Sequence, residues 1–237
     1  MNKTYFGKPG FCIITEIERP EDTIVHDLSE YPVAVLGDGM GRFSVMDSGI
    51  KPLLRTMRMC GTAITVEIHP ADNLMVHAAM KIAQKGDIIV INARGNTENG
   101  IYGDILNSVA RRKELGGIII DGAIRDCVEI EESGVPVFCR AISPLGGGKE
   151  GPGQVNIPVS CGGIVVAPGD VVVGDGDGVV VIPSRFLHDA LEGARNKTKA
   201  ENKRLETIAT GKDEDIYPSW LIPTLREKGI LKESETL

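Results

Sequence analysis

The sequence has few aromatic residues, no long apolar run and no excess of positive charge, and each deficit excludes a class of protein. Aromatic residues make up only 4% of the 237 residues. No apolar run approaches the roughly 20 residues of a membrane-spanning helix, and the N-terminus lacks the apolar core of a signal peptide. The formal net charge is −7 without any basic block, whereas nucleic-acid binding needs a basic surface. We therefore expect a cytoplasmic protein that binds neither nucleic acid nor a membrane.

Cysteine and histidine are too scattered for the common structural and catalytic motifs. The five cysteines form no CxxC pair, and their odd number argues against a disulfide framework. No HExxH pattern and no GxSxG sequence is present, which argues against a zinc protease and a nucleophile-elbow hydrolase. Two glycine-rich strings, 37–41 and 146–149, match neither the dinucleotide nor the P-loop pattern, so we expect flexible loops there.

Glycine is abundant, with 29 residues, and it separates short runs of valine and isoleucine. Such runs are typical of short buried strands that end in turns. Apolar periodicity between the first strands predicts helices, the first of them with Asp72 as its N-cap. The expected helices are 72–85, 103–115 and 123–134. The expected strands are 63–66, 88–91, 118–120, 135–138, 164–166, 171–173 and 179–182.

This order of elements predicts an α/β fold with a layered β/β/α build. Strands alternate with helices up to about residue 140, which is typical of an α/β layer. Asp-Gly pairs between the later β-branched runs favour hairpins and hence a second, β-rich layer. A long charged helix is expected at 184–210. We therefore predict one domain over 1–210 and a C-terminal helical extension over 211–237, which holds the only tryptophan.

Two parts outside these elements receive separate interpretations. The glycines and the proline of 44–54 favour a loop or a short helix near the first strand. Trp220 lies in a polar tail, where an isolated tryptophan is more often a docking anchor than a catalytic group.

The stretch from Gly103 to Asp126 holds the candidate site. A polar, flexible loop with Asn96 and Asn99 is expected to lead into a helix that starts near Gly103, and the free N–H groups of a helix start can bind a carboxylate. Arg125 and Asp126 follow an apolar strand, and ligands of α/β sheets gather at the carboxyl ends of strands. Arginine can grip a carboxylate and aspartate can bind a hard cation. From these residues alone, an ordinary surface ion pair is an equally good interpretation.

Asp104 and Arg125 are separated by 20 residues, and Asp126 follows directly. Further characteristic strings lie at 61–66, 72–73, 103–106, 120–126, 136–138, 168–170 and 177–183. This spacing and these strings resemble those of a known family, the class II pyruvate aldolases, over about 45–210. Members of this type cleave 4-hydroxy-4-methyl-2-oxoglutarate and 4-carboxy-4-hydroxy-2-oxoadipate, and RraA-like regulators of ribonuclease activity have the same fold.

The resemblance implies a swivelling β/β/α fold, a homotrimer or dimer of trimers with sites between subunits, and Mg²⁺ or Mn²⁺ as the cofactor. By position, Asp126 should bind the metal directly, Asp104 should bind it through water, and Glu201 of a neighbouring subunit should hold further waters. The implied catalytic residues are Arg125, Asp104 and Asp126. The implied substrate-binding residues are Gly103, Asp104, Ile105, Leu106 and Arg125.

The implied function is that of a carbon–carbon lyase that acts on a small 2-oxo acid. A 4-hydroxy-2-oxo di- or tricarboxylic acid would be cleaved to pyruvate and a carbonyl product. Oxaloacetate would be decarboxylated at the same site, because both reactions pass through a pyruvate enolate. The alternative is a non-enzymatic RraA-like protein that binds and inhibits a ribonuclease. A quinone methyltransferase finds no support, because no cofactor-binding glycine motif is present.

Overall fold

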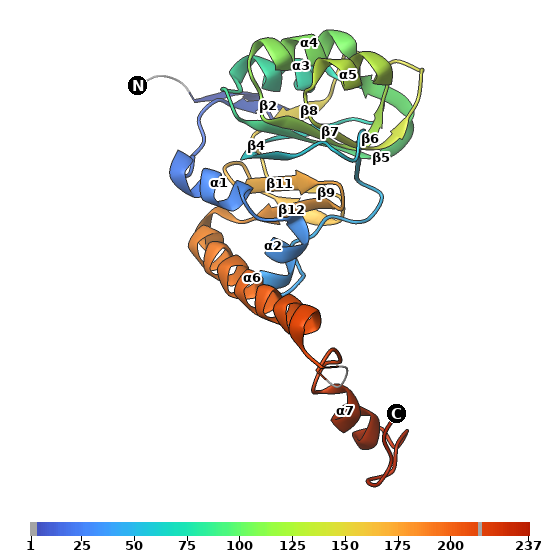
Figure 1. Ribbon diagram of the computed structural model, residues 1–237. Helices are drawn as coiled ribbons and strands as arrows, with labels where there is room; N and C mark the ends of the chain where they lie inside the picture. Colours follow the sequence, from blue (N-terminus) through green and yellow to red (C-terminus); the bar gives the residue numbers. More distant parts are fainter. Residues whose placement is uncertain (1–3, 213–214) are drawn as a thin grey trace. The chain divides into compact units, whose positions relative to one another are not determined.

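The computed structural model of the protein describes residues 4–212 and 215–237. Contacts within the chain group it into two compact units, Met1–Ala194 and Arg195–Leu237. The first unit stacks a group of helices, a large mixed sheet, a second β layer and further helices (Figure 1). This architecture confirms the α/β fold and the β/β/α layering, and it adds helices on the far side of the second β layer.

A mixed sheet forms the centre of the first unit. Its order is β1-β2-β8-β4-β5-β6-β7-β3, and the neighbours from β4 to β7 pair in parallel. Because layers cover both faces of these central strands, β6 and the first part of β5 are largely apolar, and β6 is buried at every position. The strands are β1 (Tyr5–Lys8), β2 (Phe11–Ile14), β3 (Lys51–Pro52), β4 (Met59–Ile68), β5 (Ile88–Tyr102), β6 (Gly117–Ile124), β7 (Val137–Ile142) and β8 (Gly153–Val155).

Three helices cover one face of this sheet: α3 (Leu74–Ile82), α4 (Asp104–Arg112) and α5 (Cys127–Ser133) (Figure 1). Their apolar sides pack with the sheet in one core cluster, which includes Tyr102 and Leu106. The predicted cap of the first helix is wrong by one residue, because Asn73 is the N-cap. Asp72 instead accepts a hydrogen bond from the Leu74 N–H at 2.9 Å.

The second β layer packs against the other face of the sheet through a separate apolar cluster that contains Phe138. It consists of the pair β9 (Val159–Cys161) and β10 (Ile164–Val166), and of the hairpin β11 (Val171–Asp175) and β12 (Gly178–Ile182). Asp175 faces Gly178 at the tip of that hairpin, as the Asp-Gly pattern predicts. β11 also pairs with β4 and so joins the two layers.

Helices α1 (Asp22–Ser29) and α2 (Val33–Gly39) and the first turns of α6 (Leu187–Thr210) cover the outer side of β11 and β12. The prediction of a flexible loop at 37–41 is therefore wrong for Gly37 and Gly39, which end α2. Gly39 packs so closely on Gly193 of α6 that a Cβ atom there would lie 2.9 Å from the Gly193 carbonyl carbon. Segment 44–54 has no helix; it contains the short strand β3.

Two further expectations are corrected around the candidate site. The residues from Asn96 to Tyr102 belong to β5 instead of a flexible loop, and they pair with β6 through several register shifts. Ala123 and Ile124 extend β6, so the helix expected from 123 begins only at Cys127. At 96–102, pairing with β6 prevails over the local turn preference of glycine and asparagine, and at 123–124, pairing with β5 and β7 prevails over the helical pattern.

The second unit comprises the rest of α6 and the short helix α7 (Leu221–Glu227). Arg204 of α6 donates hydrogen bonds to the carbonyls of Asp215 and Ile216. Trp220, just before α7, is 63% exposed. The predicted domain boundary at residue 210 stays a prediction. Within the described residues, no helix has both the length and the apolar character needed to cross a membrane.

Candidate functional site

The junction between β6 and α5 brings the side chains of Arg125 and Asp126 next to each other and to the backbone N–H of Asp104. Asp126 follows β6 and Arg125 in a left-handed conformation, with φ 55° and ψ 45°. Its Oδ2 accepts the Asp104 N–H at 3.0 Å and lies 3.5 Å from Arg125 Nε. A non-glycine residue with positive φ is uncommon, and such conformations cluster at ligand-binding sites. The assignment of these residues to a site, like their catalytic roles, stays a prediction.

The first turn of α4 presents backbone donors beside these residues. The first intrahelical bond runs from the Asn107 N–H to the Gly103 carbonyl at 3.0 Å. The N–H groups of Ile105 and Leu106 precede that bond, so the helix itself gives them no acceptor. Both residues line the same pocket as Arg125. A helix start with donors directed at a pocket favours an anionic ligand.

Three glycines enclose the Arg125 side chain. A Cβ atom at Gly100 would lie 2.9 Å from Arg125 Cβ, one at Gly103 would lie 3.0 Å from its Cγ, and one at Gly146 would lie 2.7 Å from its Nη1. All of these contacts are closer than real side chains tolerate or at that limit. Glycine at each position therefore allows the guanidinium to lie against backbone, which limits its rotamers.

A buried hydrogen-bond chain fixes the positions of α4 and α5. Tyr102 Oη lies 3.1 Å from Asn107 Oδ1, and Asn107 Nδ2 donates to Ser133 Oγ at 2.7 Å. Asn107 is fully buried, and burial raises the pKa of Tyr102, so its hydroxyl stays protonated. Satisfied buried networks of this kind hold packed elements in one arrangement. Here the network connects the first turn of α4 to the end of α5.

Arg125 lines a pocket of about 160 Å³ that the sequence predicts only in part. Besides Arg125 and the start of α4, it is lined by Asn73, His77, Gly147 and Lys149. The string 146–149 was the available signal, but it was interpreted as a flexible loop. In the structure it is anchored, because Gly148 donates to the Ala71 carbonyl at 2.7 Å and accepts the Asn73 N–H at 3.0 Å.

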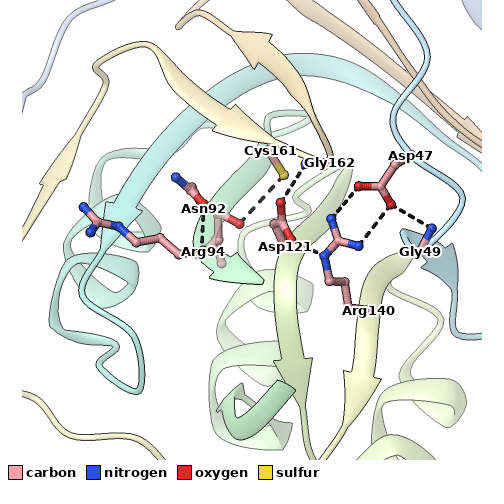
Figure 2. Close-up of polar contacts among 9 residues, drawn as sticks. Asp47, Gly49, Asn92, Arg94, Asp121, Arg140, Cys161 and Gly162 are labelled. Atoms are coloured by element: carbon pink, nitrogen blue, oxygen red, sulfur yellow. Dashed lines mark hydrogen bonds and ion pairs between the residues drawn. The ribbon is translucent and has the colours of Figure 1, made fainter. Parts of the chain in front are cut away.

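A second polar cluster lies on the other face of β6, as Figure 2 shows. Asp121 accepts hydrogen bonds from Arg140 Nε and from the Gly162 N–H, the latter at 2.8 Å. Arg140 also donates two hydrogen bonds to Asp47, at 2.6 and 3.0 Å. The hydrogen bond from Arg140 holds the pKa of Asp47 below its ordinary value. Sequence reasoning treated Asp121 only as part of a buried strand.

Around Asp126, the donor set suits a cation that keeps much of its own water. Asp126 Oδ2 is oriented by the backbone N–H of Asp104, and the Asp104 carboxylate belongs to the residue that makes this contact. The described residues contain no group of three or more histidine, cysteine or acidic side chains that could hold a metal. Mg²⁺ binds well through one or two carboxylates and several waters, so the residues present fit it.

Glu201, the third predicted metal group, lies in α6 within the second unit. There it pairs with Lys197 at 3.3 Å. Its assignment to a neighbouring subunit stays a prediction.

Comparisons with known proteins agree with this fold. The RraA-like (Aldolase/RraA) family matches residues 24–181, more than half of the chain. A Halalkalibacterium halodurans protein with the provisional name 4-hydroxy-4-methyl-2-oxoglutarate aldolase is 37% identical over 193 residues, which cover 81% of this chain and 92% of that protein. Streptomyces coelicolor RraAS2, described as an unusual member of the RNase ES inhibitor RraA protein family, is 30% identical, with a TM-score of 0.72 over 79% of this chain and 98% of that one. The RNA-processing inhibitor RraA from Thermus thermophilis is 25% identical, with a TM-score of 0.60 over 64% of this chain and 92% of that one. The chain belongs to the RraA-like (Aldolase/RraA) family.

Proposed function

We propose that this protein is a divalent-metal-dependent carbon–carbon lyase that releases pyruvate from 4-hydroxy-2-oxo acids and also decarboxylates oxaloacetate. One observation carries the proposal: Arg125 and the open N–H groups of α4 line a single small pocket, directly beside Asp126 and Asp104. The relative named for 4-hydroxy-4-methyl-2-oxoglutarate aldolase supports the same reaction class.

The size of the pocket limits the ligand. A nucleotide or a large cofactor needs more room than this, since drug-sized ligands occupy pockets of about 300–1,000 Å³. A short organic acid suits the volume.

We assign the parts of this reaction to residues of the chain. The N–H groups of Ile105 and Leu106 bind the carboxylate of the oxo acid, and Arg125 donates to its C2 oxygen. Removal of the 4-hydroxyl proton forms the carbonyl product as the C3–C4 bond breaks, and the electron pair moves onto the C2 oxygen of the pyruvate enolate. Protonation at C3 then gives pyruvate. Arg125 stabilises the negative charge that develops on that oxygen. Electrostatic stabilisation of this kind usually lowers the activation barrier of an enzyme more than any other single effect.

Asp126 and Asp104 would hold the divalent cation, whose chemistry is to act as a Lewis acid on the oxo acid. The oriented Oδ2 of Asp126 leaves its second oxygen for that ligation. We also propose that a second copy of the chain completes the site, in a homotrimer or a dimer of trimers. Ile105, Val109 and Val128 expose apolar side chains on α4 and α5 next to the pocket, at 74%, 39% and 58%. Apolar surface of this kind beside a site is typical of an interface.

The test is a pyruvate-release assay with oxaloacetate and with 4-hydroxy-4-methyl-2-oxoglutarate, in Mg²⁺, in Mn²⁺ and after chelation. We expect turnover of both acids with metal and loss of turnover with chelator. Arg125→Ala should lower kcat by about 10²–10³-fold or more, since loss of one oxyanion donor costs that much. Asp126→Ala should abolish turnover with no change in the far-ultraviolet circular dichroism. Failure of the wild-type protein on every 4-hydroxy-2-oxo acid, with either metal, would refute the proposal.

Ribonuclease inhibition is the second candidate, and one observation favours it: RraA proteins of Streptomyces coelicolor and Thermus thermophilis, described as inhibitors, have the same fold. The two candidates separate in one experiment. A ribonuclease inhibitor should reduce RNA cleavage by its partner in the presence of chelator and with Arg125→Ala. An enzyme of the proposed kind should leave RNA cleavage unchanged.

A further inference from the structure

The buried polar network at the end of β5 has no part in the reaction as proposed so far. Tyr102 Oη donates to Asn107 Oδ1 at 3.1 Å, and Asn107 Nδ2 donates to Ser133 Oγ at 2.7 Å. Tyr102 and Asn107 are both completely buried. Burial of a hydroxyl and an amide costs free energy unless they are paired, and apolar groups of the same shape would often stabilise a core equally well. The geometry that the network fixes is therefore the better explanation for it.

The protons of the network have only one consistent arrangement. The Ser133 hydroxyl donates its single proton to the Ile130 carbonyl at 2.7 Å, so its oxygen can only accept from Asn107. The amide nitrogen of Asn107 must then face Ser133, and the amide oxygen must face the Tyr102 hydroxyl. A side chain held at both ends in this way is confined to one rotamer. It therefore also fixes the rotation of α4, the helix that carries it.

Two backbone hydrogen bonds close the network into a ring around the junction of β6 and α5. The Arg125 N–H donates to the Tyr102 carbonyl at 2.9 Å. The Ile130 N–H donates to the Asp126 carbonyl at 3.1 Å. The ring thus runs from Arg125 through the three side chains of the network to Asp126, and these two residues are neighbours in sequence at the centre of the candidate site.

Asn107 connects this ring to the first turn of α4. Its own N–H makes the first hydrogen bond within that helix, at 3.0 Å. The N–H groups of Ile105 and Leu106 lie in the same turn and have no acceptor within the helix. The Asp104 N–H, also in this turn, donates to Asp126 Oδ2 at 3.0 Å. A rotation of α4 would therefore move all of these donors together.

We propose that Asn107, held by Tyr102 and Ser133, is a positioning residue that directs the N–H groups at the start of α4 and so controls how tightly the site binds the carboxylate of its substrate. The inference rests on the proposed function for the identity of that substrate. These N–H groups contact the carboxylate equally in the ground state and in the transition state, so their displacement raises KM and leaves kcat nearly unchanged. A merely structural role has the opposite signature, because a smaller folded fraction lowers the apparent kcat and leaves KM unchanged.

Steady-state pyruvate release from oxaloacetate measures this difference, at saturating Mg²⁺ so that metal affinity does not enter. Asn107→Leu removes both side-chain hydrogen bonds at similar volume, and Ser133→Ala removes one of them. We expect KM to rise about tenfold in Asn107→Leu and by less in Ser133→Ala, with kcat within about twofold of wild type in both. Ser133→Thr keeps the hydroxyl and should keep the wild-type KM.

Thr65→Val is the matched control for the loss of a buried hydrogen bond. Thr65 is also completely buried, and its hydroxyl donates to the Ile157 carbonyl. It lines no part of the pocket beside Arg125. This variant should therefore keep the wild-type KM, even where it lowers the stability of the protein.

Hydrogen exchange tests the positioning role without any turnover. The Asp104 amide is protected by its bond to Asp126 Oδ2. Its exchange, followed by nuclear magnetic resonance in the absence of metal and substrate, should become about tenfold faster in Asn107→Leu relative to the amides in the centre of β6. That reference removes the effect of global unfolding, which accelerates both. The ratio should stay at the wild-type value in Thr65→Val.

Three results would overturn the inference: an unchanged exchange ratio at Asp104 in Asn107→Leu, a lowered kcat with an unchanged KM in that variant, or an equal rise of KM in Thr65→Val. If Asn107→Leu does not fold, Ser133→Ala and Ser133→Thr carry the same comparison. The proposed function fails separately. Absence of turnover in the wild-type protein removes the lyase, and the exchange at Asp104 alone then decides for or against the positioning role.

Discussion

Replacement of Arg140 by methionine is the most informative test of how much the ion pair between Arg140 and the nearly buried Asp121 contributes to the stability of the first unit. Arg140 bridges Asp121, whose side chain is only 10% exposed, and Asp47, whose side chain is 44% exposed. Removal of one partner from a buried ion pair costs about 3–5 kcal/mol, because a charge is left buried and unpaired. Arg140 itself is 23% exposed, so the lower part of that range applies to Asp121. The solvated pair with Asp47 adds at most about 1 kcal/mol.

Urea unfolding of Arg140→Met at neutral pH should therefore show a loss of about 3 kcal/mol of unfolding free energy. With a slope of roughly 1–3 kcal/mol per molar urea, the midpoint should fall by at least about 1 M. Arg42→Met is the matched control, because Arg42 pairs with Asp38 on the surface, where solvent weakens the ion pair. That variant should keep the wild-type midpoint.

The pH dependence gives a second measurement on the same variant. The hydrogen bond from Arg140 lowers the pKa of Asp47 in the folded protein. A lowered folded-state pKa contributes stability that is present above the unfolded value of about 3.9 and is lost as the pH falls through the folded value. Arg140→Met lacks this contribution. The difference in unfolding free energy between wild type and variant should therefore begin to narrow as the pH falls to about 4, and should narrow further as the pH falls through the folded-state pKa of Asp47.

Two results would refute this reasoning. One is a loss below about 1 kcal/mol at neutral pH, which is the value expected of a surface pair. The other comes from Asp121→Leu combined with Arg140→Met. If the unpaired buried charge is the cause, removal of Asp121 as well should recover part of the lost stability, since apolar replacements of buried pairs are often neutral. A double variant that is less stable than Arg140→Met would contradict it.

Three further predictions concern glycine and cysteine. Gly103→Ala should leave the midpoint of urea unfolding within about 1 M of the wild-type value. It should lower the affinity for metal, because a methyl group at this position collides with Asp126 Oδ2. Mn²⁺ titration followed by paramagnetic resonance would measure that affinity. Gly122→Ala should destabilise the protein by about 1–3 kcal/mol in urea, since its Cβ would lie 2.7 Å from Ala93 Cβ in a packed core. Burial raises the pKa of Cys60 to about 12, so iodoacetamide at pH 8 should modify it far more slowly in the folded protein than in urea.

The sequence predicted the elements whose signal is local and strong. β6, the hairpin between β11 and β12 and the long helix α6 all follow from β-branched runs, an Asp-Gly pair and an extended charged pattern. The location of Arg125 and Asp126 also follows, because a polar pair directly after a buried strand must leave the sheet at its carboxyl end.

Features that depend on pairing between distant segments were not predicted. The N-terminal hairpin of β1 and β2 joins the sheet only through β8, which lies some 140 positions further along the chain. The pocket wall with Lys149 forms because Gly148 pairs with the segment before α3. No local pattern in 146–149 encodes that partner, so a string rich in glycine is interpreted as a flexible loop.

The extension of β5 shows why the geometry of the site could not be predicted from the sequence. Between Ile91 and Tyr102, β5 pairs with β6 at only three positions, with a register shift before each. Gly122 permits the close approach, since its Cβ would lie 3.0 Å from the Asn96 carbonyl oxygen. Each one-residue shift in a strand exchanges its two faces. The irregular pairing therefore decides which side of the sheet Arg125 faces, and the hydrogen bond from its N–H to the Tyr102 carbonyl at 2.9 Å fixes that choice. The residues that carry the chemistry are local in sequence, but their direction is set by the neighbouring strand.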